Sequence, residues 1–188
     1  FKDIAWGLAS NGVAVLRYNK RTKQHPEKMI AVFENADVYD EVIDDAIYAV
    51  NLLLNNSDNY NIDKSKIYVL GHSLGGTLVP RIAEKSKDIA GLISMAGMTR
   101  RLENVLLEQY NYLFALDNEI SADEKVKIDE LQRQINNMLS PDLSKATPSD
   151  SLPLNMPAKY WMTFKTIDPV REIANFKGKI LILQGMRD

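Results

Sequence analysis

Cysteine is absent from the 188 residues of this chain, which excludes disulfides, thiolate nucleophiles and cysteine-based metal sites together. A cysteine-free chain fits a reducing compartment, and we expect a cytoplasmic protein. No apolar run approaches the roughly 18 residues that a membrane-spanning helix needs, so no membrane span is expected. The formal net charge of −2 provides no basic field, so nucleic acid is not expected as a partner.

Motifs for bound groups are also missing. The sequence has no phosphate-binding glycine loop, dinucleotide fingerprint or metal-ligand spacing, so we expect no cofactor and no metal. The two ends lack the polar, loosely held residues that are usual at domain edges. Phe1 leads directly into a helical pattern, and the chain closes on Asp188 shortly after an apolar run. We therefore expect a fragment, which a removed signal peptide could have preceded.

Short, continuously apolar runs predict the strands of this chain. Continuous apolarity indicates burial on both faces, which is typical of a parallel sheet covered by helices. The predicted strands are residues 13–16, 67–70, 89–95 and 180–183. Between the first two, residues 37–55 predict a helix with acidic opening turns and one apolar stripe. The members of that stripe are Val38, Val42, Ala46, Ala49, Val50 and Leu53. The alternation of strands and helices predicts the α/β class.

A different pattern follows the third predicted strand. Residues 102–139 are helical in period, with a capping box at Ser121 and Glu124 that opens a second helix. The apolar face of that helix comprises Ile128, Leu131, Ile135, Met138 and Leu139. Asp168 and Pro169 then predict the start of a short helix. We expect a core at residues 1–98, a helical cap insertion at 99–166, and a return to the core at 167–188.

The pentapeptide at residues 71–75, Gly-His-Ser-Leu-Gly, lies directly after the predicted strand 67–70 and before a helical stretch. A nucleophile elbow requires this strand–turn–helix setting, with the serine on a strained, positive-φ bend. The tight turn predicts that neither Gly71 nor Gly75 has room for a Cβ atom. The backbone N–H of Leu74 would then point at a developing oxyanion. The alternative is a glycine-rich turn in which Ser73 is idle.

The motif Gly-His-Ser-Leu-Gly-Gly resembles that of bacterial α/β-hydrolases, especially esterases and serine aminopeptidase-like hydrolases. Residues 15–21, 61–63 and 180–188 look like the family's fourth strand, its lead-in to the elbow, and the strand and turn that deliver the triad acid. The resemblance implies an α/β-hydrolase fold fragment in which Ser73 is the nucleophile. It implies that Asp188 is the acid that orients the catalytic histidine, the alternative being a solvated terminal carboxylate. Asn19 departs from the aspartate common at its position.

The catalytic histidine is the missing member. In this fold it follows the serine and the acid along the chain. Both histidines of the sequence, His25 and His72, precede Ser73. His72 neighbours the nucleophile, but adjacent side chains of the elbow point in different directions, and His25 lies in a polar loop. We therefore expect this chain to be inactive or nearly so. The parent protein would carry its histidine about 25–40 residues beyond Asp188.

The expected reaction is hydrolysis of a carboxylic ester, or else of an amide or thioester, through an acyl-enzyme formed with a small-molecule acyl substrate. Tyr160 and Trp161 fall where similar proteins often carry aromatic residues near the acyl pocket, although they could equally pack a short helix on the sheet. Two other functions stay open at this point. One is a non-catalytic binding or assembly domain, and the other is acyl transfer to an acceptor other than water.

The fold that the resemblance implies has one more strand between residues 13–16 and 67–70, and that strand would precede Phe1. The exposed edges cannot stay unpaired. We expect either that residues 13–16 pair directly with residues 67–70, or that the chain forms a homodimer. We also expect the Oγ of Ser73 to lie near Asp188.

Overall fold

The computed structural model describes residues 1–186 as a mixed α/β structure. Its helices are α1 Lys2–Ser10, α2 Arg21–Gln24, α3 Pro26–Val32, α4 Asp44–Asn55, α5 Ser57–Tyr60, α6 Leu74–Lys85, α7 Leu102–Phe114, α8 Ala122–Leu139, α9 Ala158–Phe164 and α10 Pro169–Asn175. Its strands are β1 Tyr68–His72, β2 Gly91–Met95 and β3 Lys179–Leu183. Single 3-10 turns lie at Phe33–Asn35, Lys64–Lys66, Ser149–Ser151 and Pro153–Asn155, and a π-helical turn lies at Tyr39–Ile43.

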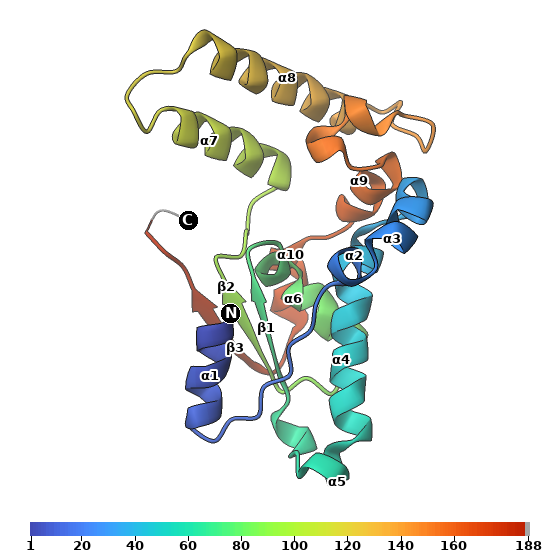
Figure 1. The fold of residues 1–188 in the computed structure, drawn as a ribbon, viewed down its shortest axis with the longest axis vertical. Coiled ribbons are helices and arrows are strands. Elements are labelled where there is room, and N and C mark those ends of the chain that lie inside the picture. Colours follow the sequence, from blue (N-terminus) through green and yellow to red (C-terminus); the bar gives the residue numbers. More distant parts are fainter. Residues whose placement is uncertain (187–188) are drawn as a thin grey trace.

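The strands form one parallel sheet in the order β1-β2-β3. Val69 of β1 is opposite Leu92 of β2, which is opposite Ile180 of β3. The carboxyl ends of all three strands point toward the helical hairpin formed by α7 and α8 (Figure 1). Three of the four predicted strands are therefore confirmed, with boundaries shifted by one or two residues.

The prediction of a strand at residues 13–16 is wrong. This segment runs in extended form between α1 and α2, but it joins no ladder in the described part of the chain, and the sheet ends at β1. Direct pairing with the strand before Ser73 is therefore wrong as well. A strand needs a neighbour for its backbone N–H and C=O groups, and the apolar sequence alone does not provide one. Formation of a homodimer stays a prediction.

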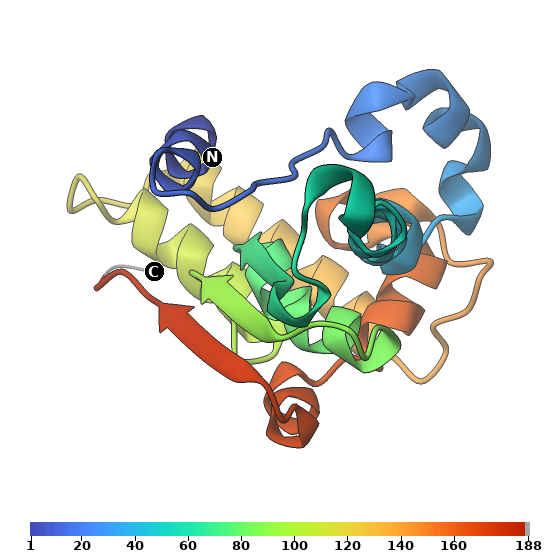
Figure 2. The ribbon, with the colours of Figure 1, turned by 90° about the horizontal axis from the view of Figure 1, so that it is seen from below.

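Burial in the sheet is uneven. Leu92 of β2 is fully buried, whereas Ile180, Leu181, Ile182 and Leu183 of β3 are 42–62% exposed. Helix α6 packs against β1 and β2, while β3 lies at the sheet's other edge (Figure 2). The expected burial of both faces is thus not met along β3, because its apolar side chains extend beyond the cover that α6 provides.

Helix α6, which begins directly after Ser73, is the best-anchored element. Leu78, Val79 and Ile82 of α6 are in the core, and Arg81 extends across to α10. The guanidinium of Arg81 pairs with the carboxylate of Glu172 and donates to the Tyr39 hydroxyl at 2.9 Å. The side chains of this ion pair are only 12% and 9% exposed. The pair therefore fixes α10 against α6.

The helix predicted at residues 37–55 is present, but its first turn is the π-helical Tyr39–Ile43. Val38, Val42, Ala46 and Val50 are buried as their spacing predicts. Ile43, which the α-helical stripe omits, is fully buried too. A π turn is wider than an α turn, so it brings one more residue onto the inner face.

The helix caps predicted from the sequence are found at the starts of α8 and α10. At the start of α8, Ser121 N–H donates to the Glu124 carboxylate at 2.9 Å, and the Glu124 N–H donates back to the Ser121 hydroxyl at 3.3 Å. Asp168 accepts from the Arg171 N–H at 3.0 Å at the start of α10. Leu131, Ile135 and Met138 form the buried face of α8, whereas Leu139 is exposed. Among the described residues, no helix has the length and apolarity to cross a membrane.

Candidate functional site

Ser73 occupies a strained turn between β1 and α6. Its backbone has φ 54° and ψ −118°, and it caps the N-terminus of α6. This is the positive-φ conformation, between a parallel strand and a helix, that the sequence predicts. Its N–H donates to the Met95 carbonyl of the adjoining strand at 2.9 Å. Ala96, which follows β2, also has a positive φ of 48°, and its N–H donates to the Leu183 carbonyl at 2.8 Å.

The glycines around Ser73 have different roles. A Cβ atom on Gly71 would lie 2.2 Å from the Gly75 carbonyl oxygen, so the turn requires glycine there, as predicted. The same prediction for Gly75 is wrong, because its Cβ would meet nothing within 4 Å. Gly76 is the second restricted position, since its Cβ would lie 2.8 Å from the Met95 carbonyl oxygen. Gly76 faces β2, whereas Gly75 faces open space.

A threonine one helical turn after Ser73 ties the turn to the next loop. The Thr77 hydroxyl donates to the Ser73 carbonyl at 3.2 Å and accepts from the Met98 N–H at 2.9 Å. Beside it, the Ser94 hydroxyl donates to the Gly76 carbonyl at 3.0 Å. Sequence reasoning missed both hydroxyls. The only available signal was the position of Thr77 four residues after the serine, which places it over the same helical face.

Leu74 is the first residue of α6. The first N–H groups of a helix have no intrahelical acceptor, and the helix dipole makes this end positive. An anionic oxygen close to Ser73 would therefore meet an available donor in the Leu74 N–H.

A cavity lies at the carboxyl ends of the strands, and one of its lining residues, His72, directly precedes Ser73 in the sequence. This cavity of about 340 Å³ is lined by His72, Met95, Ala96, Leu183, Gln184 and Gly185. The ring of His72 packs edge-on against Phe1, with centroids 5.3 Å apart. His25 lies elsewhere, at the exposed start of α3. Asp188 is outside the described residues, so its distance from Ser73 stays a prediction.

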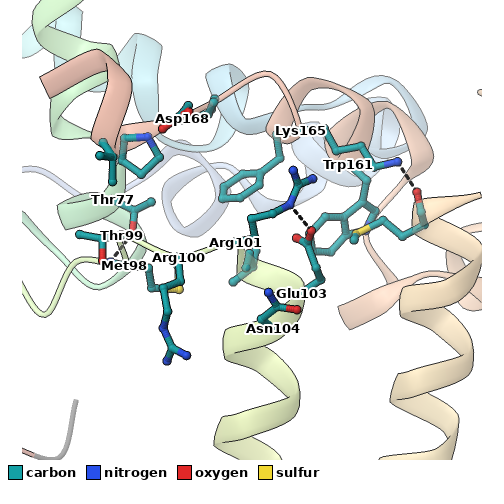
Figure 3. Close-up of a pocket in the computed structure, with 16 residues that line it drawn as sticks. Thr77, Met98, Thr99, Arg100, Arg101, Glu103, Asn104, Trp161, Lys165 and Asp168 are labelled. Carbon is teal, nitrogen blue, oxygen red and sulfur yellow. Dashed lines mark hydrogen bonds and ion pairs between the residues drawn. The ribbon is translucent and has the colours of Figure 1, made fainter. Parts of the chain in front are cut away.

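A larger cavity of about 520 Å³ lies between the β2–α7 loop, α9 and α10 (Figure 3). Thr77 and Met98 line it on one side and Trp161 on another. The Trp161 indole is 1% exposed, and its Nε1 has no hydrogen-bond partner among the described residues. Charged groups at the rim are already engaged: Arg101 pairs with Glu103, as Figure 3 shows. The cavity therefore combines an aromatic wall with a charged, internally paired rim.

Arg100, which also lines this cavity, is engaged by a carboxylate. Its two terminal nitrogens each lie 2.6 Å from an oxygen of Glu108, on α7. This bidentate pair is exposed to solvent. Arg100 thus meets a carboxylate of its own chain.

Tyr160 is not among the residues that line either cavity. It is buried, and its hydroxyl donates to the Glu41 carboxylate at 2.8 Å. Its ring contacts Trp161 edge-on, with centroids 5.5 Å apart. Burial raises the pKa of Tyr160 above its ordinary value, and the carboxylates of Glu41 and Asp37 raise it further.

This environment predicts a loss of stability at alkaline pH. The folded-state pKa of Tyr160 exceeds the unfolded value of 10.0, so the folded state retains a proton that the unfolded state loses. The free energy of unfolding should therefore fall as pH rises above 10, by up to about 1.4 kcal/mol per pH unit from this group. Urea unfolding on both sides of that pH, compared between wild type and Tyr160→Phe, measures the slope. Tyr112→Phe, on the exposed face of α7, is the control. Equal slopes in wild type and Tyr160→Phe would contradict the assignment.

Comparison with known proteins places the chain in a family. The BD-FAE family model matches residues 32–188. Esterase EstD of Thermotoga maritima is 37% identical over 191 aligned residues, which cover 100% of this chain and 41% of that protein. The chain thus spans about two-fifths of the length of this curated relative. No solved structure matches the chain. The chain therefore belongs to the BD-FAE family, which is of the α/β-hydrolase type, and its parallel sheet with covering helices agrees with that type.

Proposed function

We propose that this chain carries the nucleophile of a serine hydrolase that cleaves carboxylic esters. The observation that carries the proposal is the backbone of Ser73, held at φ 54° between β1 and α6. A serine at such a nucleophile elbow exposes its Oγ at the end of the sheet. Membership of the BD-FAE family and the similarity to an esterase support the same reaction.

In the proposed reaction, a histidine takes the proton from the Ser73 Oγ as the oxygen attacks the ester carbonyl. The carbonyl oxygen becomes an oxyanion, which accepts a hydrogen bond from the Leu74 N–H. The histidine then gives its proton to the departing alcohol, and the carbon–oxygen bond of the ester breaks. Water hydrolyses the resulting acyl-enzyme by the same steps. Asp188 would orient the histidine and stabilise its positive charge.

Neither histidine of the chain suits the role of the base. His72 packs against Phe1 and His25 is at the start of α3. We propose that the base comes from outside this chain, so the 188 residues alone should hydrolyse esters poorly. The complete gene product is therefore the proper material for activity measurements.

We assign the acyl group of the substrate to the cavity of Figure 3. Its volume of about 520 Å³ is in the range of small-molecule sites. Trp161 would form its aromatic wall, and Tyr160 would support that wall from behind through the edge-on ring contact. Residues 99–166 would act as a cap that limits the size of the acyl group.

Covalent labelling tests the nucleophile directly. A fluorophosphonate probe, added to the complete gene product, should attach to the Ser73 Oγ and abolish ester hydrolysis in proportion to labelling. Cleavage after Lys66 and Arg81 releases a tryptic peptide, residues 67–81, in which Ser73 is the only serine. Fragmentation of that peptide locates the adduct, and the heat-denatured protein is the control. Full inhibition with the label on a different residue would contradict the proposal.

A further inference from the structure

We propose that Thr77 is a positioning residue, whose hydroxyl holds Ser73 in its reactive backbone conformation and couples it to the β2–α7 loop. This inference rests on the proposed function of Ser73. Thr77 also lines the cavity that we assign to the acyl group, but its hydroxyl is engaged by the Ser73 carbonyl and the Met98 N–H, so it would act through Ser73.

The Ser73 carbonyl receives two hydrogen bonds from Thr77. The Thr77 N–H donates to it at 3.0 Å and the Thr77 hydroxyl at 3.2 Å. Threonine hydroxyls in helices often donate to the carbonyl four residues earlier. What distinguishes Thr77 is a second partner outside the helix, since its oxygen accepts the Met98 N–H at 2.9 Å. Thr77 is only 4% exposed, so water cannot readily replace it in this bridge.

The bridge joins one strained residue, Ser73, to the loop that follows a second one, Ala96. Ser73 at φ 54° and Ala96 at φ 48° both have left-handed backbones without being glycine. Such conformations persist only where the surroundings over-determine them. The Ser73 N–H donates to the carbonyl of Met95, the residue before Ala96, and the Thr77 hydroxyl accepts from the N–H of Met98, two residues after Ala96. Removing the hydroxyl therefore loosens Ser73 directly and frees the loop two residues after Ala96, while the core contacts of α6 remain.

Loss of this bridge should affect the chemical step more than substrate binding. A nucleophile displaced by about 1 Å can cost on the order of 100-fold in rate. Thr77→Val keeps the shape of the side chain and removes the hydroxyl. In the complete gene product, we expect Thr77→Val to lower kcat about 10- to 100-fold for a short p-nitrophenyl ester, with KM changed less than about 3-fold. Thr77→Ser, which keeps the hydroxyl, should restore kcat to within about 3-fold of wild type.

Ser94→Ala provides the matched control. The Ser94 hydroxyl also donates to a carbonyl in the first turn of α6, but to that of Gly76, at 3.0 Å, instead of that of Ser73. If these hydroxyls only stabilised the fold, Ser94→Ala and Thr77→Val would have similar effects on kcat. We expect Ser94→Ala to keep kcat within about 3-fold of wild type, even if its unfolding midpoint falls as far as that of Thr77→Val.

The outcomes separate this inference from the proposed function. If Ser73→Ala is inactive but Thr77→Val keeps wild-type kcat, the positioning role is wrong and the nucleophile stands. If the kcat of Thr77→Ser falls as low as that of Thr77→Val, the inference is wrong too. The same holds if Ser94→Ala lowers kcat as much as Thr77→Val does. Should Thr77→Val not fold, Thr77→Ala and Thr77→Ser, which differ only by the hydroxyl, give the same comparison. A fully active Ser73→Ala would overturn the proposed function itself.

Discussion

Replacing Ser73 with alanine in the complete gene product should lower kcat for a short p-nitrophenyl ester by about four to six powers of ten. Alanine at φ 54° preserves the turn but has no oxygen to form the acyl-enzyme. A residual rate should persist, because the oxyanion donor and the binding cavity remain. KM should change little, since the Ser73 Oγ contributes mainly in the transition state.

The control for this substitution is Ser10→Ala, at the exposed end of α1. It should leave kcat and KM at wild-type values. Hydrolysis by Ser73→Ala at the wild-type rate would rule out the nucleophile, whatever the fold. An equal loss in Ser10→Ala would show that the assay reports folding instead.

Two alanine substitutions in the same turn should differ sharply in stability. In Gly71→Ala the new methyl group would lie 2.2 Å from the Gly75 carbonyl oxygen, a backbone atom that cannot move without reshaping the turn. We expect a loss of several kcal/mol in the free energy of unfolding, in the range of overpacked cores and strained turns. Gly75→Ala places its methyl in open space within α6, where alanine should stabilise the helix by about 0.5–1 kcal/mol.

Urea unfolding of both variants measures the difference. The two proteins differ only in which glycine of the turn carries the methyl group, so composition and helix content are matched. Gly71→Ala with wild-type stability would show that the turn is less tight than its geometry requires. A strongly destabilised Gly75→Ala would show that the space beside Gly75 is filled.

Much of the fold follows from local patterns in the sequence. The capping box at Ser121 and the cap at Asp168 were predictable because each depends on residues within one helical turn. The apolar runs 67–70, 89–95 and 180–183 predicted strands, and these predictions are confirmed because the three segments join one ladder. Residues 13–16 have the same apolar composition but join none, and composition cannot tell whether a neighbour exists. Ile43 was missed because a π turn changes the period that the prediction assumed.

The backbone of the candidate site was predictable from the sequence, whereas the contacts that hold this backbone in place were less so. The strand, the glycine turn and the helix around Ser73 are contiguous in sequence, so their arrangement follows from one motif. The restriction at Gly76 depends on β2, and the bridge from Thr77 depends on the loop after β2. Those contacts join segments about 20 residues apart, which periodicity does not reveal. The hydrogen bond from the Tyr160 hydroxyl to Glu41 joins segments still farther apart in the sequence, and no local pattern predicts it.

The contrasting exposure of the two tryptophans provides an optical reporter. Trp6 on α1 is 59% exposed, and Trp161 on α9 is 1% exposed beside the larger cavity. Indole emission shifts to longer wavelength as the ring meets water, so the two residues contribute separate bands. A water-soluble quencher should suppress the Trp6 band first and leave that of Trp161. The remaining blue emission then reports the environment of the cavity, and an acyl group that enters it should change that emission without any added dye.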